Sequence, residues 1–159
     1  MTCSVAGGLL DSDEPGIIAF LTNVKTAVLL IDSDLGFVFW LGRALDNAGY
    51  EAFPAKSISD ALRLMAELHL SMSLVIVNHA LPGAAEFIAD LRNTQKLVKV
   101  MALIEDTDSA VALPDVDCEV VRPYGVDEEA KAEFVRTVRR VLGPTDIAHG
   151  MAVHRRSMP

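Results

Sequence analysis

Short apolar segments alternate along this chain with longer segments in which apolar residues recur at the spacing of a helix. The short segments are residues 26–31, 50–54, 73–77, 97–104 and 118–121. The longer segments are residues 35–48, 58–70, 84–92, 108–113 and 127–142, and residues 108–113 leave room for only a turn or two of helix. A strand that is apolar throughout must be covered on both faces, as in parallel sheets with helices on either side. We therefore expect an α/β three-layer sandwich around a five-stranded parallel sheet, with a short fourth helix.

The length and composition fit one globular domain. The chain has 159 residues, of which 51% are hydrophobic and 23% are charged, as is ordinary for a folded protein. We assign residues 26–143 to the domain, residues 1–25 to an N-terminal extension and residues 144–159 to a C-terminal tail. The formal net charge of -8 argues against nucleic acid as a partner, because non-specific binding requires clustered Lys and Arg side chains.

The beginning of the chain shows neither a secretion signal nor a membrane segment. Acidic residues stand where a signal peptide carries positive charge. Lys25, Asp32 and Asp34 interrupt the longest apolar region well short of the length of a membrane span. We expect a cytoplasmic protein that does not contact a membrane.

Polar side chains follow the apolar segments at the points where the predicted strands end. These side chains are Asp32, Ser33 and Asp34 after the first segment, Asn78 after the third, and Arg122 with Pro123 after the fifth. The carboxyl ends of parallel strands meet at one edge of the sheet, where ligands bind in open α/β folds. We therefore expect a crevice at this edge that brings together carboxylates, an amide and a guanidinium.

Four motifs in this order and spacing resemble the receiver domain of bacterial two-component response regulators. They are LLIDSD at the first strand, RALDNAGYEA at the end of the first helix, LVIVNHALPG at the third strand and VVRPYG after the fifth strand. The resemblance covers residues 25–143. It implies a flavodoxin-like sheet with strand order 2-1-3-4-5 and a place in two-component signalling or a phosphorelay.

The resemblance also implies that the phosphoacceptor site is degenerate. The two adjacent acids that help to hold Mg²⁺ in the family become Asp32 and Ser33, and the aspartate that accepts the phosphoryl group becomes Asn78. A carboxamide is a far poorer nucleophile than a carboxylate, and no neighbouring base would activate it. With only one of the family's three acids left, we expect weak Mg²⁺ binding at most, and no cofactor.

The switch positions of the family are altered as well. The hydroxyl-bearing residue of the fourth strand falls on Ala102 or Leu103, and the aromatic residue of the fifth strand is replaced by Glu119. The family's Lys-Pro pair becomes Arg122-Pro123, where Arg122 keeps a positive charge but is planar and always protonated. Because the family often has a cis peptide before this proline, we expect the Arg122–Pro123 bond to be cis.

Local structural roles compete with these interpretations. Asp34 is a candidate N-cap of the following helix, and for Asp32 we favour an ion pair with Arg122, whose fork can bridge both acids in place of a metal. Asn78 is either a disabled phosphoacceptor or a turn residue that bonds the next loop, and the two roles are compatible. We interpret His79 as a solvated loop residue.

We interpret the chain as a stand-alone pseudo-receiver that is not phosphorylated and acts through protein–protein contacts. The partners that we expect are a histidine kinase, another regulator, an output protein or a second copy of the chain. No catalytic combination of side chains is apparent, so we do not expect an enzyme. Two alternatives stay open: a small-molecule sensor that uses Ser33, Asn78 and Arg122 as polar contacts, and an atypical response regulator that is still phosphorylated.

Overall fold

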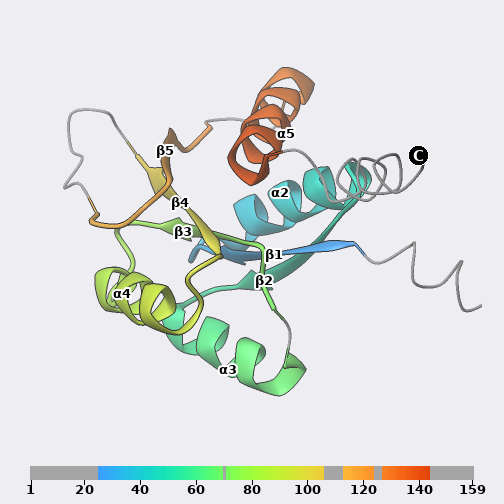
Figure 1. Cartoon of the computed structure of the whole chain (residues 1–159). Coiled ribbons are helices and arrows are strands. Elements are labelled where there is room, and N and C mark those ends of the chain that lie inside the picture. The colour runs from blue at the N-terminus through green and yellow to red at the C-terminus, as the bar shows by residue number, and fades with distance from the viewer. Residues whose placement is uncertain (1–24, 70, 106–112, 124–126, 144–159) are drawn as a thin grey trace, which may run out of the picture.

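Five parallel strands form a single sheet in the order β2-β1-β3-β4-β5 (Figure 1). The structure is a computed structural model and describes residues 25–69, 71–105, 113–123 and 127–143. The strands are β1 (Thr26–Ile31), β2 (Tyr50–Ala55), β3 (Leu74–Asn78), β4 (Lys99–Ile104) and β5 (Cys118–Val121). The predicted flavodoxin-like fold and its strand order are confirmed.

Helices cover both faces of the sheet. The helices α2 (Leu35–Asn47) and α5 (Glu128–Leu142) lie on one face, and α3 (Ile58–Leu68) and α4 (Ala84–Thr94) lie on the other (Figure 1). The short helix expected over residues 108–113 lies outside the described residues except for Leu113, which is not helical. No helix in the described ranges is long and apolar enough to cross a membrane.

The helices begin where the local sequence can satisfy free backbone N–H groups. Asp34, Ser57 and Asp127 are the N-caps of α2, α3 and α5, and each side chain accepts a hydrogen bond from a backbone N–H in the first turn. The N-cap of α4 is Gly83, which has a φ of 83°. Because this left-handed conformation favours glycine, the Pro-Gly pair positions the chain to enter α4.

The strands divide their side chains between two apolar layers. Val28 and Leu30 of β1 belong to the core under α2 and α5, whereas Leu29 and Ile31 belong to the core over α3 and α4. This division follows from the two-residue period of a strand. Asp32 follows Val28 and Leu30 at the same two-residue spacing, so it lies on the face that α2 and α5 cover.

Arg92, near the end of α4, fixes the loop that leads into β5. Its guanidinium donates hydrogen bonds to the backbone carbonyls of Asp115 (2.9 Å) and Val98 (2.5 Å) and to the carboxylate of Asp117 (2.5 Å). The same carboxylate oxygen of Asp117 accepts from the backbone N–H of Val100 at 2.8 Å. Burial alone would raise the pKa of Asp117, but the bonds from Arg92 and Val100 outweigh it and lower the pKa below its usual value.

Replacing Arg92 by Met is expected to lower the free energy of unfolding by about 1–3 kcal/mol. Methionine keeps the apolar stem, removes the Arg92 donor from two carbonyls and leaves the Asp117 carboxylate with only the Val100 N–H. Arg63→Met is a matched control, because Arg63 pairs with Asp60 at the surface and such pairs contribute about 0–1 kcal/mol. Denaturant unfolding measures both variants, and equal losses would contradict the role given to Arg92.

Candidate functional site

Asp32, Asn78 and Arg122 lie on the same face of the sheet at its carboxyl edge. Each stands two residues beyond a residue of the core under α2 and α5, namely Leu30, Ile76 and Val120. Because strand side chains alternate with a period of two, all three polar side chains lie on the face of the sheet that α2 and α5 cover. The sheet thus brings together three of the residues that the sequence placed in the crevice.

Asp32 is a buried carboxylate that the surrounding chain satisfies with hydrogen bonds. Its side chain is 2% exposed. One carboxylate oxygen accepts from the backbone N–H of Asp34 at 2.9 Å, and the other accepts from Nδ2 of Asn78 at 3.2 Å. A buried charge is costly unless it is paired and hydrogen-bonded, so this arrangement depends on the amide of Asn78.

Asn78 has the turn role that the sequence considered, and its amide also bonds to Asp32. Its Oδ1 accepts a hydrogen bond from the backbone N–H of Ala80 at 2.9 Å, while its Nδ2 donates to Asp32. Because the Ala80 N–H needs an acceptor and the Asp32 carboxylate needs a donor, the amide fits in one orientation. Asn78 therefore forms the turn after β3 and also supplies the donor that a carboxylate at this position would lack.

Arg122 brings a positive charge to the same edge. Its Nη2 donates to the Asp34 carboxylate at 2.8 Å, and its Nε lies 3.6 Å from Oδ2 of Asp32. The longer distance is an ion pair without a hydrogen bond, and the buried Nε has no hydrogen-bond partner among the described residues. The guanidinium carbon also lies 4.4 Å above the ring centre of Phe37, a cation–π contact. The fork of Arg122 thus bridges both acids, and its hydrogen bond goes to Asp34.

Asp34 has two roles at once. It caps α2 by accepting from the backbone N–H of Phe37 at 3.2 Å, and it binds Arg122 with its other carboxylate oxygen. The hydrogen bond from Phe37, followed by the one from Arg122, lowers the pKa of Asp34 below its usual value. The expected N-cap role of Asp34 and the expected contact of this acid with the fork of Arg122 thus occur together in one side chain.

The switch positions contribute no polar group to the crevice. Ala102 and Leu103 are buried within β4, and Glu119 of β5 is exposed and lies opposite Ala102 in the strand register. Ser33 is exposed at the end of β1. The hydrogen-bonded centre is therefore smaller than the set of residues that the resemblance assigned.

The peptide bond between Arg122 and Pro123 is trans, so the expectation of a cis bond is wrong. The trans isomer is the lower-energy form of an X-Pro bond unless the surrounding structure selects cis. The backbone N–H of Arg122 donates to the carbonyl of Ile104 at 2.7 Å. This bond continues the pairing of β5 with β4 and holds Arg122 at the edge of the sheet.

His79 lies in the turn after β3, as expected, but its ring bonds to the neighbouring strand, so the expectation of a solvated side chain is wrong. Its Nδ1 lies 2.9 Å from the carbonyl oxygen of Leu103, and its backbone N–H donates to the same oxygen at 3.0 Å. Since a carbonyl accepts only, Nδ1 carries the proton in this bond. The ring ties the turn after β3 to β4 and is half-buried.

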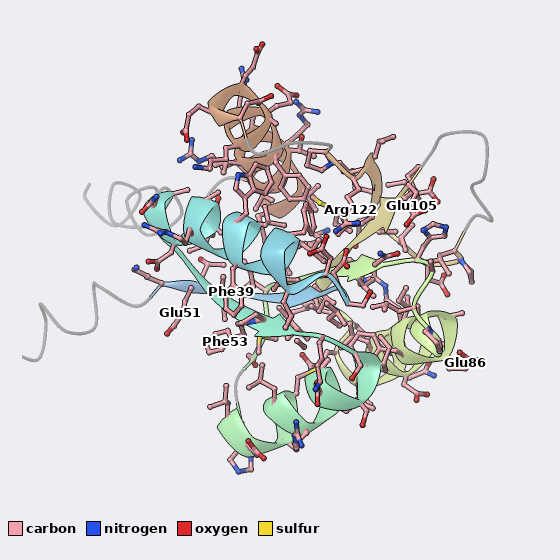
Figure 2. The ribbon with its side chains drawn as sticks, turned by 180° about the vertical axis from the view of Figure 1, so that it is seen from behind. Phe39, Glu51, Phe53, Glu86, Glu105 and Arg122 are labelled. Carbon is pink, nitrogen blue, oxygen red and sulfur yellow. The ribbon has the colours of Figure 1, made fainter. Side chains whose placement is uncertain are left out.

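Two further residues of the site were missed in the sequence. Phe37 supplies the ring under Arg122, and the available signal was an aromatic residue in the first turn after Asp34. Glu105 directly follows Ile104, to whose carbonyl Arg122 is bonded, so its exposed carboxylate also lies at this edge. Figure 2 shows Arg122 and Glu105 at the ends of β5 and β4.

The donor set of the crevice does not fit Mg²⁺. The Asp32 oxygens are engaged by Asp34 and Asn78, and the guanidinium of Arg122 brings a positive charge to within 3.6 Å of that carboxylate. Mg²⁺ requires an octahedron of hard oxygen ligands and would have to displace these contacts. Within the described ranges, no three His, Cys, Asp or Glu side chains gather as a metal site.

Replacing Arg122 by Met is expected to lower the free energy of unfolding by about 1–3 kcal/mol. The variant keeps apolar contact with Phe37 but leaves the buried Asp32 carboxylate without its countercharge. Adding Asp32→Asn should recover part of this loss, because the uncompensated charge is then gone. Arg139→Met is the matched control on the exposed face of α5. Chemical denaturation measures the wild type, the two single variants, the double variant and the control, and additive losses in the double variant would argue against the pairing.

The stabilising effect of the Asp34 charge should depend on pH. A lowered folded-state pKa means that the charge stabilises the fold above the ordinary value of 3.8 and that this contribution disappears as pH falls through the folded-state pKa. Asp34→Asn keeps a capping oxygen for Phe37 and removes the charge together with the acceptor for Arg122. The difference in unfolding free energy between wild type and variant should therefore be largest at neutral pH and should shrink toward zero in acid. A difference that is constant with pH would contradict this expectation.

No protein-family model and no curated protein sequence matches the chain, but several solved structures share its fold. The chemotaxis response regulator CheY4 of Vibrio cholerae gives a TM-score of 0.60 at 20% identity, over 74% of this chain and 99% of CheY4. The signal receiver domain of an HD domain-containing protein from Pseudomonas fluorescens Pf-5 gives 0.62 at 21% identity, over 75% and 95% of the two chains. The response regulator TrrA of Thermotoga maritima, in complex with Mg²⁺-BeF, gives 0.56 at 23% identity, over 70% and 97%. The chain therefore has the fold of CheY-like receiver domains over nearly the whole length of these neighbours.

Proposed function

We propose that the chain is a receiver-like signalling protein that is not phosphorylated and acts through contact with another protein. The hydrogen bond from Asn78 Nδ2 to the buried carboxylate of Asp32 is the observation that carries this proposal. At the position where the receiver family has its phosphoacceptor, this chain has an amide with both its nitrogen and its oxygen engaged.

The contacts of Asn78 and Arg122 disfavour the transfer of a phosphoryl group to this crevice. An acceptor residue must present an oxygen with nucleophilic electron density to phosphorus. The Asn78 oxygen belongs to a neutral amide and accepts from Ala80. The transfer also requires positive charge that stabilises the phosphoryl oxygens, whereas the charge of Arg122 is already directed at Asp32 and Asp34.

The same contacts favour a single arrangement of the crevice. A two-state response requires a ligand that interacts differently with the two states. In this chain the positive charge is carried by the side chain of Arg122, so its ion pairs with Asp32 and Asp34 persist without an added ligand. We infer that the crevice holds one conformation for a protein partner to bind, such as a histidine kinase, another regulator or an output protein.

A small-molecule sensor that uses this crevice is a weaker proposal. Two of the residues that would contact such a ligand are already engaged. Asn78 is bonded to Asp32 and Ala80, and Arg122 is bonded to Asp34. A ligand would have to displace these partners and remove the donor that Asn78 provides to the buried Asp32 carboxylate, which is costly. We likewise propose no enzymatic activity, since the crevice groups satisfy one another.

The wild-type protein is expected to gain no phosphoryl group from acetyl phosphate and Mg²⁺, as measured by intact mass. Mg²⁺ alone should leave its thermal unfolding unchanged, because Arg122 supplies the positive charge. Asn78→Asp places a second carboxylate beside Asp32, where like charges repel. This variant should unfold at a lower temperature without Mg²⁺ and regain stability when Mg²⁺ is added. An acid-labile adduct on the wild type would overturn the proposal.

The same two proteins test the proposed mode of action when they are used as baits in extracts of the native cell. Wild type should retain a specific protein with and without acetyl phosphate, because its crevice does not change state. Asn78→Asp should retain less of that protein, since its crevice is rearranged. Equal retention by both baits would show that the partner does not depend on the crevice.

A further inference from the structure

Two of the large apolar side chains that the structure exposes lie one helical turn apart on α2. Leu35 is 47% exposed and Phe39 is 60% exposed. Residues four apart on a helix occupy the same face, so the two side chains form a continuous apolar strip. Scattered exposed apolar residues are normal, but a contiguous strip beside a groove indicates an interaction surface.

This strip forms one wall of a groove at the β2 edge of the sheet. The groove has a volume of about 290 Å³, with Pro54 and Ala55 of β2 at its base and Leu64 of α3 on the opposite wall. In Figure 2, Phe39 lies between the ribbons of α2 and α3, on the side where β2 ends the sheet. All the residues that line the groove belong to the described part of the chain.

The base of the groove is a strand edge that does not favour the addition of another strand. The carbonyl of Ala55 accepts from the backbone N–H of Asp32 at 3.1 Å and therefore points toward β1. Because successive residues of a strand point to opposite sides, the backbone nitrogen of Pro54 faces the free edge, where proline has no N–H to donate. An occupant must therefore bind through side chains, which favours a helical surface over an extended peptide.

The charges around the groove make it complementary to itself. Its rim contains two cations, Lys56 and Arg63, and two anions, Asp60 and Glu67. Arg63 pairs with Asp60 within the chain, whereas Lys56 and Glu67 have no ion-pair partner among the described residues. The two unpaired charges have opposite signs and lie toward opposite ends of α3. Lys56 precedes the first turn of this helix, and Glu67 lies about 10 Å beyond that turn. A two-fold axis between them would bring Lys56 of each copy to Glu67 of the other.

We propose that this face is the interface of a symmetric homodimer, in which Phe39 of each copy inserts into the groove of the other. A second copy fits better than a strongly charged partner, because the rim is electrically balanced in a chain whose net charge is -8. The ring of Phe39 supplies the apolar anchor, and the pairs between Lys56 and Glu67 set the register. The proposal concerns a different surface from the crevice and does not depend on the phosphorylation state of the protein.

Sedimentation equilibrium of the full chain over a wide concentration range tests the dimer. Wild type should show reversible association to twice the mass of one chain. Phe39→Glu should raise the dimer dissociation constant roughly tenfold or more, because central aromatic anchors dominate interfaces. Leu97→Glu is the matched control, since Leu97 is 94% exposed between α4 and β4, far from the groove in sequence, and it should leave association unchanged.

A charge exchange separates the proposed interface from an effect on folding. Lys56→Glu and Glu67→Lys should each weaken the dimer, because each places like charges opposite one another. The double variant should restore association, which a folding defect would not do. A wild type that stays monomeric at every concentration overturns the proposal, including the case in which a different protein is found to bind the groove. A dimer that neither Phe39→Glu nor the single exchanges weaken overturns it as well.

Discussion

The arrangement of the crevice depends on one buried negative charge, the carboxylate of Asp32. The alternation of β1 directs this side chain under α2 and α5, where it is almost completely removed from water. Such a charge requires both hydrogen-bond donors and a countercharge. The backbone of Asp34 and the amide of Asn78 provide the donors, and Arg122 provides the countercharge. The contacts of this single side chain thus hold together the end of β1, the turn after β3 and the end of β5.

The amide of Asn78 is bonded at both of its polar atoms. Its nitrogen donates to the buried carboxylate of Asp32, and its oxygen accepts from the backbone N–H of Ala80. Arg122 supplies positive charge to Asp32 and Asp34 from within the chain. The polar groups at this edge of the sheet thus form an internal network.

Most of the fold could be predicted from the sequence, because its signals are local. Continuous apolar runs identify buried parallel strands, and the residues Asp34, Ser57 and Asp127 mark helix starts through bonds within a single turn. The bonds of His79 to Leu103 and the stacking of Arg122 on Phe37 could not be predicted in this way. They join segments that are distant along the chain, and their geometry depends on strand register and side-chain rotamers. The isomer of the Arg122–Pro123 bond was wrongly predicted because the prediction relied on how often the receiver family has a cis bond at this position. No local signal in this chain selects the cis form.

The position of Pro54 has a consequence for how large an assembly of this protein can become. An unprotected edge strand offers a ladder of donors and acceptors to any other strand, and pairing of this kind can propagate into fibres. At the free edge of β2, Pro54 is the last outward-facing residue of the strand and lacks the N–H that would continue the ladder. Contacts across this edge are then left to discrete side chains, which are satisfied once one neighbour is bound. Within the described residues, the sheet thus ends at β2 with a gap in its row of donors, which disfavours growth by strand addition.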